Sequence, residues 1–350
     1  MQATGSLVPA NMFYLIILGT SFLVAALTTP LARRLSFRLG IVAVSGGRRI
    51  HSGKLPKLGG LPLMTALLVS WGLIYWLQPP LAGTSDVTLL PGVMLGTIVL
   101  FVGGLLDDWW DLPPWAQFAI QFIGLGIAMR YEVFIERFTN PLNGREVSLD
   151  QWWWLVLLLT LIWILGMINT INWLDGLDGL AAGVGTIAAL LFAWHSYNLE
   201  QYTVAAFPLA LAGALAGFLL FNFVPAKIYL AGGAYLLGYQ LATLSIISPA
   251  KIATALLVLA IPIVDVAWRI IDRVGHGRSP FQGDRGHLHH ILYDQGLPMR
   301  SIVVGYYVIT AVFGITAVWI PSPLGKLLVL LVLGTAVLAV LVRLSRRQVT

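Results

Sequence analysis

Long hydrophobic stretches alternate with short polar segments along most of the chain. A helix needs about 20 mainly apolar residues to cross the hydrocarbon core of a bilayer, and many of these stretches have that length. The pattern predicts an all-α polytopic integral membrane protein with about eleven transmembrane helices, and residues 1–350 are expected to form a single membrane domain. The predicted helices begin near residues 11, 58, 92, 114, 152, 179, 204, 235, 252, 301 and 324.

Basic residues set the expected orientation of these helices. The polar segment after the first hydrophobic stretch carries seven of them and no acidic residue: Arg33, Arg34, Arg38, Arg48, Arg49, Lys54 and Lys57. Because cytosolic loops are enriched in Lys and Arg, we expect the N-terminus outside and the C-terminus in the cytosol. Alternating crossings then place five internal segments in the cytosol: 31–57, 107–113, 172–178, 224–234 and 272–300.

Composition narrows the class of protein further. With 58% hydrophobic and 10% charged residues and a mean hydropathy of +0.85, the chain is not a soluble domain. The absence of cysteine excludes disulfides and thiolate zinc sites. A net charge of +6 is compatible with nucleic-acid binding, but the basic residues follow membrane topology, so the expected partner is the membrane and not nucleic acid.

Acidic residues gather on the predicted cytosolic side, beginning with Asp107 and Asp108 at the end of the third hydrophobic stretch. A carboxylate at the hydrocarbon boundary is unfavourable by several kcal/mol unless water, a metal or a partner compensates it. Mg²⁺ prefers carboxylate and phosphate oxygens, which suits such a pair. A solvated helix end, stopped by Pro113 and Pro114, is an equally good explanation of the pair taken alone.

The most specific motif is a run of four polar residues at every third position: Asn169, Asn172, Asp175 and Asp178. On a helix, residues with this spacing drift slowly around one face. Gly176 and Gly179 would let backbone or ligand approach closely. The run therefore predicts an oxygen-rich site for a metal, sugar hydroxyls or phosphate. A helix N-cap would explain Asp178 but not the other three.

A third motif reads Asp284-Arg285-Gly286-His287-Leu288-His289-His290. Imidazoles beside Arg285 can donate hydrogen bonds to phosphate or supply a proton near neutral pH. Zinc is a competing interpretation, but the chain has no cysteine and the histidine spacing does not suit one helical face, so phosphate is favoured. A surface histidine run without function is the third alternative.

The sequence leaves the roles of two further residues open. Lys57 belongs to a basic segment whose simplest role is topology and lipid-headgroup binding, with attraction of an anionic substrate as a functional role. Asp265, shortly after Pro262 in the ninth hydrophobic stretch, fits either a water-filled cavity or a satisfied hydrogen bond at a proline kink.

Taken together, these motifs resemble the polyprenyl-phosphate N-acetylhexosamine-1-phosphate transferases of glycosyltransferase family 4, and most of all the undecaprenyl-phosphate GlcNAc-1-phosphate transferases. The resemblance covers about residues 30–300. It rests on four motifs in the expected order: His51-x-x-x-x-Pro56-x-x-Gly59-Gly60, Asp107-Asp108, the run from Asn169 to Asp178, and His287-x-His289-His290. The related muramoyl-pentapeptide transferases carry three consecutive histidines, which sets this chain apart from them.

The resemblance implies an enzyme, a phosphotransferase that moves HexNAc-1-phosphate from a UDP-HexNAc to polyprenyl phosphate and releases UMP. It implies Mg²⁺ as the cofactor, with Mn²⁺ as an alternative, and a cytosol-facing cleft in the bacterial inner membrane. The expected pathway is cell-wall or surface-polysaccharide synthesis, such as lipopolysaccharide or teichoic acid. Which hexosamine and which polymer are involved stays open, as does a homodimer.

By the same resemblance, the motif residues acquire roles. Asp107 and Asp108 would bind metal and activate the lipid phosphate, and Asn172 would be a metal ligand. The catalytic set would also contain Asp175 and Asp178, which would hold the nucleotide sugar. Substrate-binding residues would be Lys57, Asn169, Arg285, His287, His289 and His290. Since two anions must meet, charge screening should dominate catalysis, and direct attack is favoured over a covalent intermediate.

One segment departs from the family pattern. After Leu230 the family shows Gly-Asp and a turn of small residues, whereas this chain reads Ala231-Gly232-Gly233-Ala234-Tyr235, one residue shorter and without the Asp. That Asp is expected to be a metal ligand, so its absence predicts weaker Mg²⁺ binding, a rearranged site or an inactive protein.

Other functions are therefore weighed against the transferase. The first is a catalytically impaired homologue that binds polyprenyl phosphate or a nucleotide sugar. A transporter is less favoured, because its charges would lie near the bilayer midplane and here they gather at one face. A CDP-alcohol phosphotransferase would need an Asp-rich motif with an interposed Arg, which the sequence lacks.

Overall fold

The computed structural model describes residues 9–46, 49–77, 88–247, 249–279 and 286–347. The first helices and hairpin are α1 (Ala10–Leu39), β1 (Val42–Gly46), β2 (Arg49–Pro56), α2 (Gly60–Leu77), α3 (Leu90–Trp110) and α4 (Pro114–Arg130). A second hairpin, β3 (Arg137–Thr139) and β4 (Glu146–Ser148), precedes α5 (Trp153–Leu174), α6 (Leu180–Asn198), α7 (Tyr202–Asn222) and α8 (Gly233–Ile246). The chain continues through α9 (Pro249–Val258), α10 (Ala260–Gly275), α11 (Leu288–Asp294), α12 (Met299–Trp319) and α13 (Pro323–Arg347).

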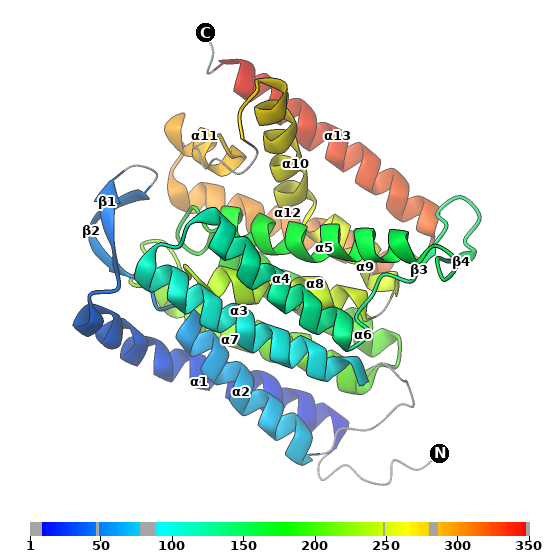
Figure 1. Ribbon diagram of the computed structural model, residues 1–350, viewed down its shortest axis with the longest axis horizontal. Coiled ribbons are helices and arrows are strands. Elements are labelled where there is room, and N and C mark those ends of the chain that lie inside the picture. Colours follow the sequence, from blue (N-terminus) through cyan, green and yellow to red (C-terminus); the bar gives the residue numbers. More distant parts are fainter. Residues whose placement is uncertain (1–8, 47–48, 78–87, 248, 280–285, 348–350) are drawn as a thin grey trace.

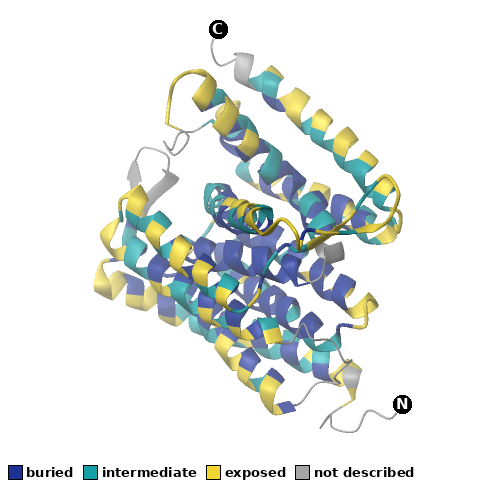
Figure 2. Cartoon of the chain, turned by 45° about the vertical axis from the view of Figure 1, so that its right-hand side comes forward, coloured by how far each residue is buried: buried dark blue, intermediate teal, exposed yellow. Residues whose placement is uncertain are grey.

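Most of the helices lie side by side, with hairpin β1–β2 and helix α11 at one end of the bundle and hairpin β3–β4 at the other (Figure 1). Helix α8 forms its centre, since every one of its residues is buried and it packs against α3, α5 and α6. Figure 2 shows the same distribution, with buried residues inside and exposed residues on the outer helices. A small-residue helix, α7, packs closely on α1 and α6.

The fold is that of a polytopic, helical membrane protein. Among the described residues, eight helices are long and apolar enough to cross a bilayer, or nine if the bent pair α9 and α10 counts as one span. Each predicted helix start lies within three residues of an observed one. However, α4 has 17 residues and α8 only 14, about 21 Å of helix, which is short of the hydrocarbon thickness. The count of eleven spans and the orientation of the termini therefore stay predictions.

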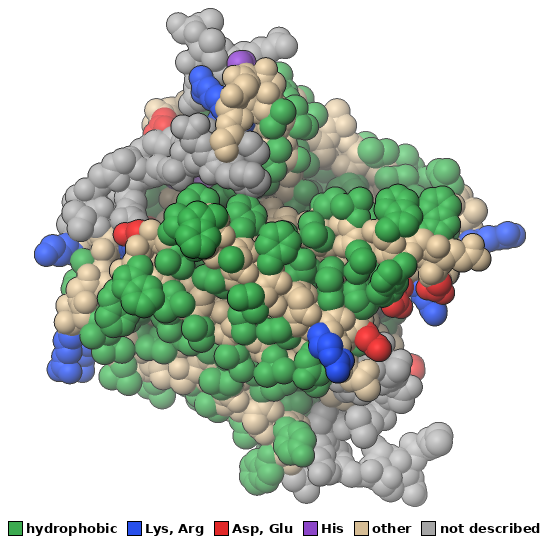
Figure 3. Space-filling view, viewed as in Figure 1, with side chains coloured by type: hydrophobic (Ala, Val, Ile, Leu, Met, Phe, Trp, Pro, Cys, Tyr) green, Lys and Arg blue, Asp and Glu red, His purple; other side chains and the backbone are tan. Residues whose placement is uncertain are grey.

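The lateral surface is what a bilayer would require. Hydrophobic side chains cover the face seen in Figure 3, and charged side chains gather toward its two ends. Almost none of the apolar length of helix α13 is buried, and the helix rests mainly on α10. Exposed apolar helices of this kind are stable only where lipid or detergent covers them.

Helix ends at the β1–β2 end of the bundle position the polar motifs. Helix α3 stops because Asp111 turns left-handed, with φ of 46°, and donates its N–H to the Asp107 carbonyl at 2.8 Å. Helix α5 ends at Leu174, and Gly179, with φ of 75°, opens α6. The segment 31–57, expected as a cytosolic polar loop in an all-α protein, instead continues α1 to Leu39 and then forms the antiparallel β1–β2 pair.

Candidate active site

The polar motifs meet around one cavity of about 440 Å³. Each of the five segments that the sequence placed in the cytosol contributes to its lining, although they are far apart in the chain. The polar and titratable residues of the lining are Lys57, Asp107, Asp108, Asp111, Gln117, Asn172, Asp175, Tyr229, His287 and His290. The cavity thus combines carboxylates, an amide, a primary amine and imidazoles within reach of one ligand.

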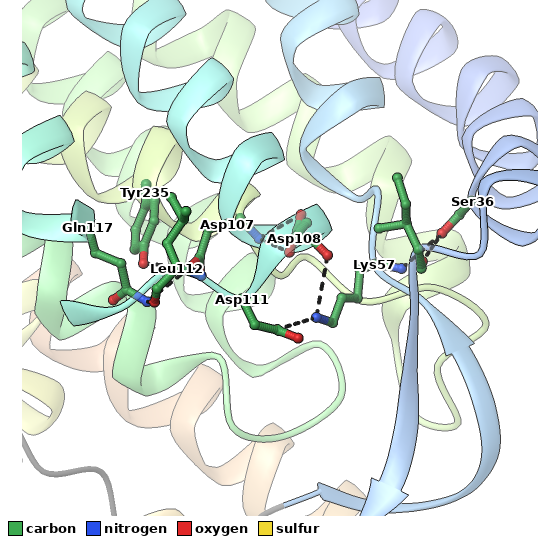
Figure 4. Close-up of polar contacts among 10 residues, drawn as sticks. Ser36, Lys57, Asp107, Asp108, Asp111, Leu112, Gln117 and Tyr235 are labelled. Atoms are coloured by element: carbon green, nitrogen blue, oxygen red, sulfur yellow. Dashed lines mark hydrogen bonds and ion pairs between the residues drawn. The ribbon is translucent and has the colours of Figure 1, made fainter. Parts of the chain in front are cut away.

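Asp107 and Asp108 leave the last turn of α3 in different directions (Figure 4). Asp107 Oδ1 accepts hydrogen bonds from the Leu112 N–H and from Gln117 Nε2, each at 3.0 Å, and its Oδ2 accepts one from the Tyr235 hydroxyl at 3.2 Å. Asp108 is only 7% exposed, and both of its carboxylate oxygens accept the Gly232 N–H at 3.1 Å. The pair is therefore held in fixed positions before any ligand arrives.

Lys57 brings positive charge to this pair from the end of the β1–β2 hairpin (Figure 4). Its buried ammonium group lies 2.8 Å from Asp111 Oδ1 and 3.5 Å from the Asp108 carbonyl oxygen. The Lys57 N–H also donates to Ser36 Oγ at 3.2 Å, which ties the hairpin to α1. A buried ammonium group facing the cavity is suited to an anionic ligand.

The run that begins at Asn169 divides at the end of α5. Asp175 lines the cavity and accepts the Ala231 N–H at 2.9 Å on its Oδ2. Desolvation raises the pKa of Asp175 to about 8, and the charge of Asp178 adds to the rise. Asp178 Oδ2 accepts the Ala226 N–H at 2.9 Å and is not part of the cavity lining. The two carboxylates therefore occupy different environments.

The three histidines pack against the same turn. A Cβ built on Gly176 would lie 2.4 Å from His289 Nε2 and 2.8 Å from His290 Nε2, so only glycine allows this approach. The rings of His287 and His289 are stacked 5.9 Å apart. Burial holds the pKa of His289 well below its ordinary value, with further lowering from His290 and His287, so its ring is neutral at pH 7.

Helix α10 carries three buried charged residues at four-residue intervals, Asp265, Arg269 and Arg273, and the first of them contacts His287. Asp265 Oδ2 lies 2.9 Å from His287 Nδ1, and Asp265 Oδ1 accepts the Leu288 N–H at 3.0 Å. The Arg273 guanidinium lies 5.7 Å from the centre of the Trp173 ring, which lines the cavity. Of the two explanations left open for Asp265, the structure shows a carboxylate with satisfied hydrogen bonds.

Some predicted site residues lie apart from the cavity lining. Asn169 forms a reciprocal amide pair with Gln121, at 2.7 and 3.3 Å, between α5 and α4. His289 lies behind His290, 1% exposed and against Gly176. Arg285 lies outside the described residues.

Conversely, the structure adds site residues that the motifs did not indicate. Tyr235 and Gln117 bind Asp107 from α8 and α4, the Arg269 guanidinium packs against Gly286, and Arg273 lies over the Trp173 ring. For the arginines, the four-residue spacing with Asp265 is a signal in the sequence, because residues at i, i+4 and i+8 share one helix face. For Tyr235 and Gln117 no local signal exists, since both contacts arise from tertiary packing.

A divalent cation can be tested against these groups. Asp107, Asp108 and Asn172 offer oxygen ligands in one cavity, the donor type that Mg²⁺ and Mn²⁺ prefer. Within the described part of the chain, no three Asp, Glu or His side chains are arranged as a closed metal cage. The residues fit a cation that takes one or two carboxylates and completes its shell with water and substrate phosphates, which is the usual mode for Mg²⁺.

Comparisons with known proteins agree with this geometry. The profile of glycosyl transferase family 4 matches residues 90–249. The chain is 30% identical over 312 residues to a probable undecaprenyl-phosphate N-acetylglucosaminyl 1-phosphate transferase of Bacillus subtilis, covering 86% of this chain and 83% of that protein. It is 31% identical to a decaprenyl-phosphate N-acetylglucosaminephosphotransferase of Mycobacterium tuberculosis, over 82% of this chain and 78% of that protein.

A phospho-N-acetylmuramoyl-pentapeptide-transferase of Geobacillus kaustophilus is also similar, at 30% identity over 87% of this chain and 97% of that protein. The chain belongs to glycosyl transferase family 4 and is a membrane phosphotransferase of the polyprenyl-phosphate HexNAc-1-phosphate transferase group. The resemblance seen in the sequence is thereby confirmed.

Proposed function

We propose that this protein transfers GlcNAc-1-phosphate from UDP-GlcNAc to undecaprenyl phosphate and releases UMP. The observation that carries the proposal is the single cavity lined by Lys57, Asp107, Asp108, Asn172, Asp175, His287 and His290. The names of the Bacillus and Mycobacterium relatives support a GlcNAc donor and a polyprenyl phosphate acceptor. The similarity to a muramoyl-pentapeptide transferase makes other HexNAc donors the alternatives to test.

In this reaction an oxygen of the polyprenyl phosphate attacks the sugar-bound phosphorus of the UDP-sugar. The bond from that phosphorus to the bridging oxygen breaks, and UMP leaves with the oxygen and its electron pair. The product is polyprenyl-diphospho-GlcNAc. Because both reactants are anions, the site must offset their repulsion more strongly in the transition state than in the ground state.

The chain's own residues supply part of that compensation. The Lys57 ammonium and the His287 and His290 imidazoles line the cavity from segments far apart in the chain and are suited to phosphate oxygens. Asp265 fixes the orientation of the His287 ring through Nδ1, which leaves Nε2 as its other polar atom. Mg²⁺, when bound by Asp107, Asp108 and Asn172, would neutralise phosphate charge.

The proposal includes a location: the bacterial inner membrane, with the cavity open to the cytosol. Basic residues after the first hydrophobic stretch support it through the positive-inside rule, and one of them, Lys57, lines the cavity. The expected pathway is the first membrane step of a wall or surface polysaccharide.

The test is UMP release by the purified full chain with undecaprenyl phosphate and Mg²⁺, using a panel of UDP-HexNAc donors. UDP-GlcNAc should give the highest rate. Asp108→Asn should lower kcat by about 100-fold or more, and Asp150→Asn, a matched change in the exposed turn before α5, should leave it unchanged. Absence of UMP with every donor would overturn the proposal.

A second candidate is a catalytically impaired homologue that binds the same substrates. It is favoured by one specific observation, the 231–235 segment, which lacks the acidic residue expected there and places backbone N–H groups on Asp108 and Asp175. Binding of UDP-GlcNAc without UMP release, at any Mg²⁺ or Mn²⁺ concentration, would select this candidate.

A further inference from the structure

The 231–235 segment offers one hydrogen-bond donor to each of three cavity carboxylates. The Ala231 N–H donates to Asp175 at 2.9 Å, the Gly232 N–H donates to Asp108 at 3.1 Å, and the Tyr235 hydroxyl donates to Asp107 at 3.2 Å. A hydrogen bond from a neutral donor to a carboxylate is a favourable, charge-assisted interaction. The segment therefore stabilises the ionised forms of three carboxyl groups with fixed dipoles.

The donors are held in place, because glycine residues pack closely against the segment on both sides. A Cβ on Gly104 would lie 2.2 Å from the Gly232 carbonyl oxygen, and a Cβ on Gly232 would lie 2.1 Å from the Gly104 carbonyl oxygen. On the other side, Gly233 and Gly60 meet with similar closeness, at 2.8 Å from a built Cβ to Cα. Ala231 holds a left-handed φ of 49°, which a non-glycine residue adopts only when its surroundings enforce it.

These donors compete with a cation for the same lone pairs. Both carboxylate oxygens of Asp108 accept the Gly232 N–H, and Asp107 Oδ2 accepts the Tyr235 hydroxyl. A cation bound to these carboxylates lies beside the partial positive charges of the donors, which repel it. The carboxylates alone therefore bind a cation weakly. Phosphate oxygens of a bound substrate would restore the missing ligands.

We propose that the 231–235 segment keeps the affinity of the cavity for a free divalent cation low, so that the cation enters together with the phosphates of a nucleotide sugar. This inference rests on the proposed function for the identity of those phosphates. By linkage, the nucleotide sugar then raises the affinity for the cation by the same factor as the cation raises the affinity for the nucleotide sugar.

The test is a Mn²⁺ titration of the full-length protein in detergent at pH 8.5, followed by the electron paramagnetic resonance signal of free Mn²⁺. It is run with and without UDP-GlcNAc, in the absence of lipid acceptor, and Mn²⁺ binding to UDP-GlcNAc alone is measured as a blank. The wild-type protein should bind Mn²⁺ at least about tenfold more tightly with UDP-GlcNAc present. Equal affinity in both conditions would overturn the proposal.

Tyr235→Phe removes one donor and should raise the affinity for Mn²⁺ without nucleotide by about tenfold, the factor expected for a hydrogen bond to a charged group. Tyr239→Phe is the matched control, since Tyr239 lies one turn further along α8 and donates to the Gly92 carbonyl at 3.0 Å, away from the cavity. Unchanged Mn²⁺ affinity in Tyr235→Phe, with a normal melting temperature, would contradict the proposal.

If Tyr235→Phe does not fold, the wild-type comparison with and without nucleotide decides alone. The two proposals also fail separately, because the titration needs no turnover. Nucleotide-dependent Mn²⁺ binding without UMP release would contradict the transferase activity only. UMP release with tight Mn²⁺ binding to the free protein would contradict the inference about the 231–235 segment only.

Discussion

Gly176 offers the sharpest perturbation of the contact between the histidines and the turn after α5. Its φ is not left-handed, so alanine is compatible with the backbone there, and the only obstacle is the added methyl group. That methyl would lie 2.4 Å from His289 Nε2, about 1 Å inside the 3.4 Å at which ordinary contact begins. Gly176→Ala must therefore displace the histidines.

The displacement reaches the cavity because the rings move as a set. His289 is 1% exposed, stacks on His287, and lies 4.3 Å from His290 between ring centres, so it has no free space of its own. A misplacement of about 1 Å in a catalytic group lowers a rate by about 100-fold, or about 2.7 kcal/mol. We expect Gly176→Ala to lower the rate of UMP release by about this factor.

The assay is UMP release under saturating UDP-GlcNAc, with the melting temperature measured in the same detergent. Gly166→Ala on α5 is the control, since a methyl there meets nothing within 4 Å and alanine favours a helix over glycine by about 1 kcal/mol. It should keep full activity. If Gly176→Ala melts normally and retains more than about a third of the wild-type rate, the argument from the histidine contact is wrong.

Three further predictions concern the contact of His287, the pKa of Asp175 and the orientation in the membrane. Asp265→Asn should lower kcat by about tenfold with little change in KM, because His287 loses its charged acceptor, and Asp265→Glu should restore part of the rate; an unchanged kcat refutes the positioning role. The pKa of Asp175 is raised to about 8 in the fold against about 3.9 unfolded, so the native state loses stability as pH rises between these values and levels off above 8. Without divalent cations, Asp175→Asn should therefore raise the free energy of unfolding and with it the melting temperature. The gain in free energy should grow over that pH window by up to about 1.4 kcal/mol per pH unit. A gain that does not depend on pH contradicts the raised pKa. Because the chain has no cysteine, Lys54→Cys should react with an impermeant thiol reagent only from the cytosol and Asn143→Cys only from outside; the reverse labelling refutes the orientation.

The positions of the helices could be predicted from the sequence because apolar stretches have no other stable conformation in a bilayer. What the stretches cannot indicate is what surrounds each helix. Helix α8 is buried on every side by protein, so its 14 residues need not match the bilayer. Helices α9 and α10 form one stretch in the sequence but bend by 79° at Leu259, where a proline follows in the first turn of α10.

The clustering of the motifs could also be predicted, because charged groups at helix ends predicted on one side of the membrane avoid the hydrocarbon core and gather in the same polar region. The spacing within the run from Asn169 was less informative. Helix α5 ends at Leu174, so Asp175 and Asp178 no longer follow its rotation, and they turn toward different partners. Asn169, still on the helix, meets Gln121 of α4, a contact that depends on how two helices pack.

The shortened 231–235 segment could be recognised in the sequence as a departure, but its consequence could not. The loss of a side chain indicates what is missing from a site. It does not indicate that Gly232 and Gly104 would meet closely enough to present a backbone N–H to Asp108, or that Tyr235 would reach Asp107 from the core of the bundle. Both follow from packing around glycine, which the local sequence does not encode.

The central claim is that this protein transfers the sugar together with the phosphate bound to it. The measurement that tests it most directly follows the label from UDP-GlcNAc carrying ³²P in the sugar-bound phosphate, with undecaprenyl phosphate as acceptor. We expect the label to enter the lipid fraction in a one-to-one ratio with released UMP, and Asp108→Asn to lower both rates by the same factor. Release of labelled UDP, or UMP release with the label left in water, would contradict it.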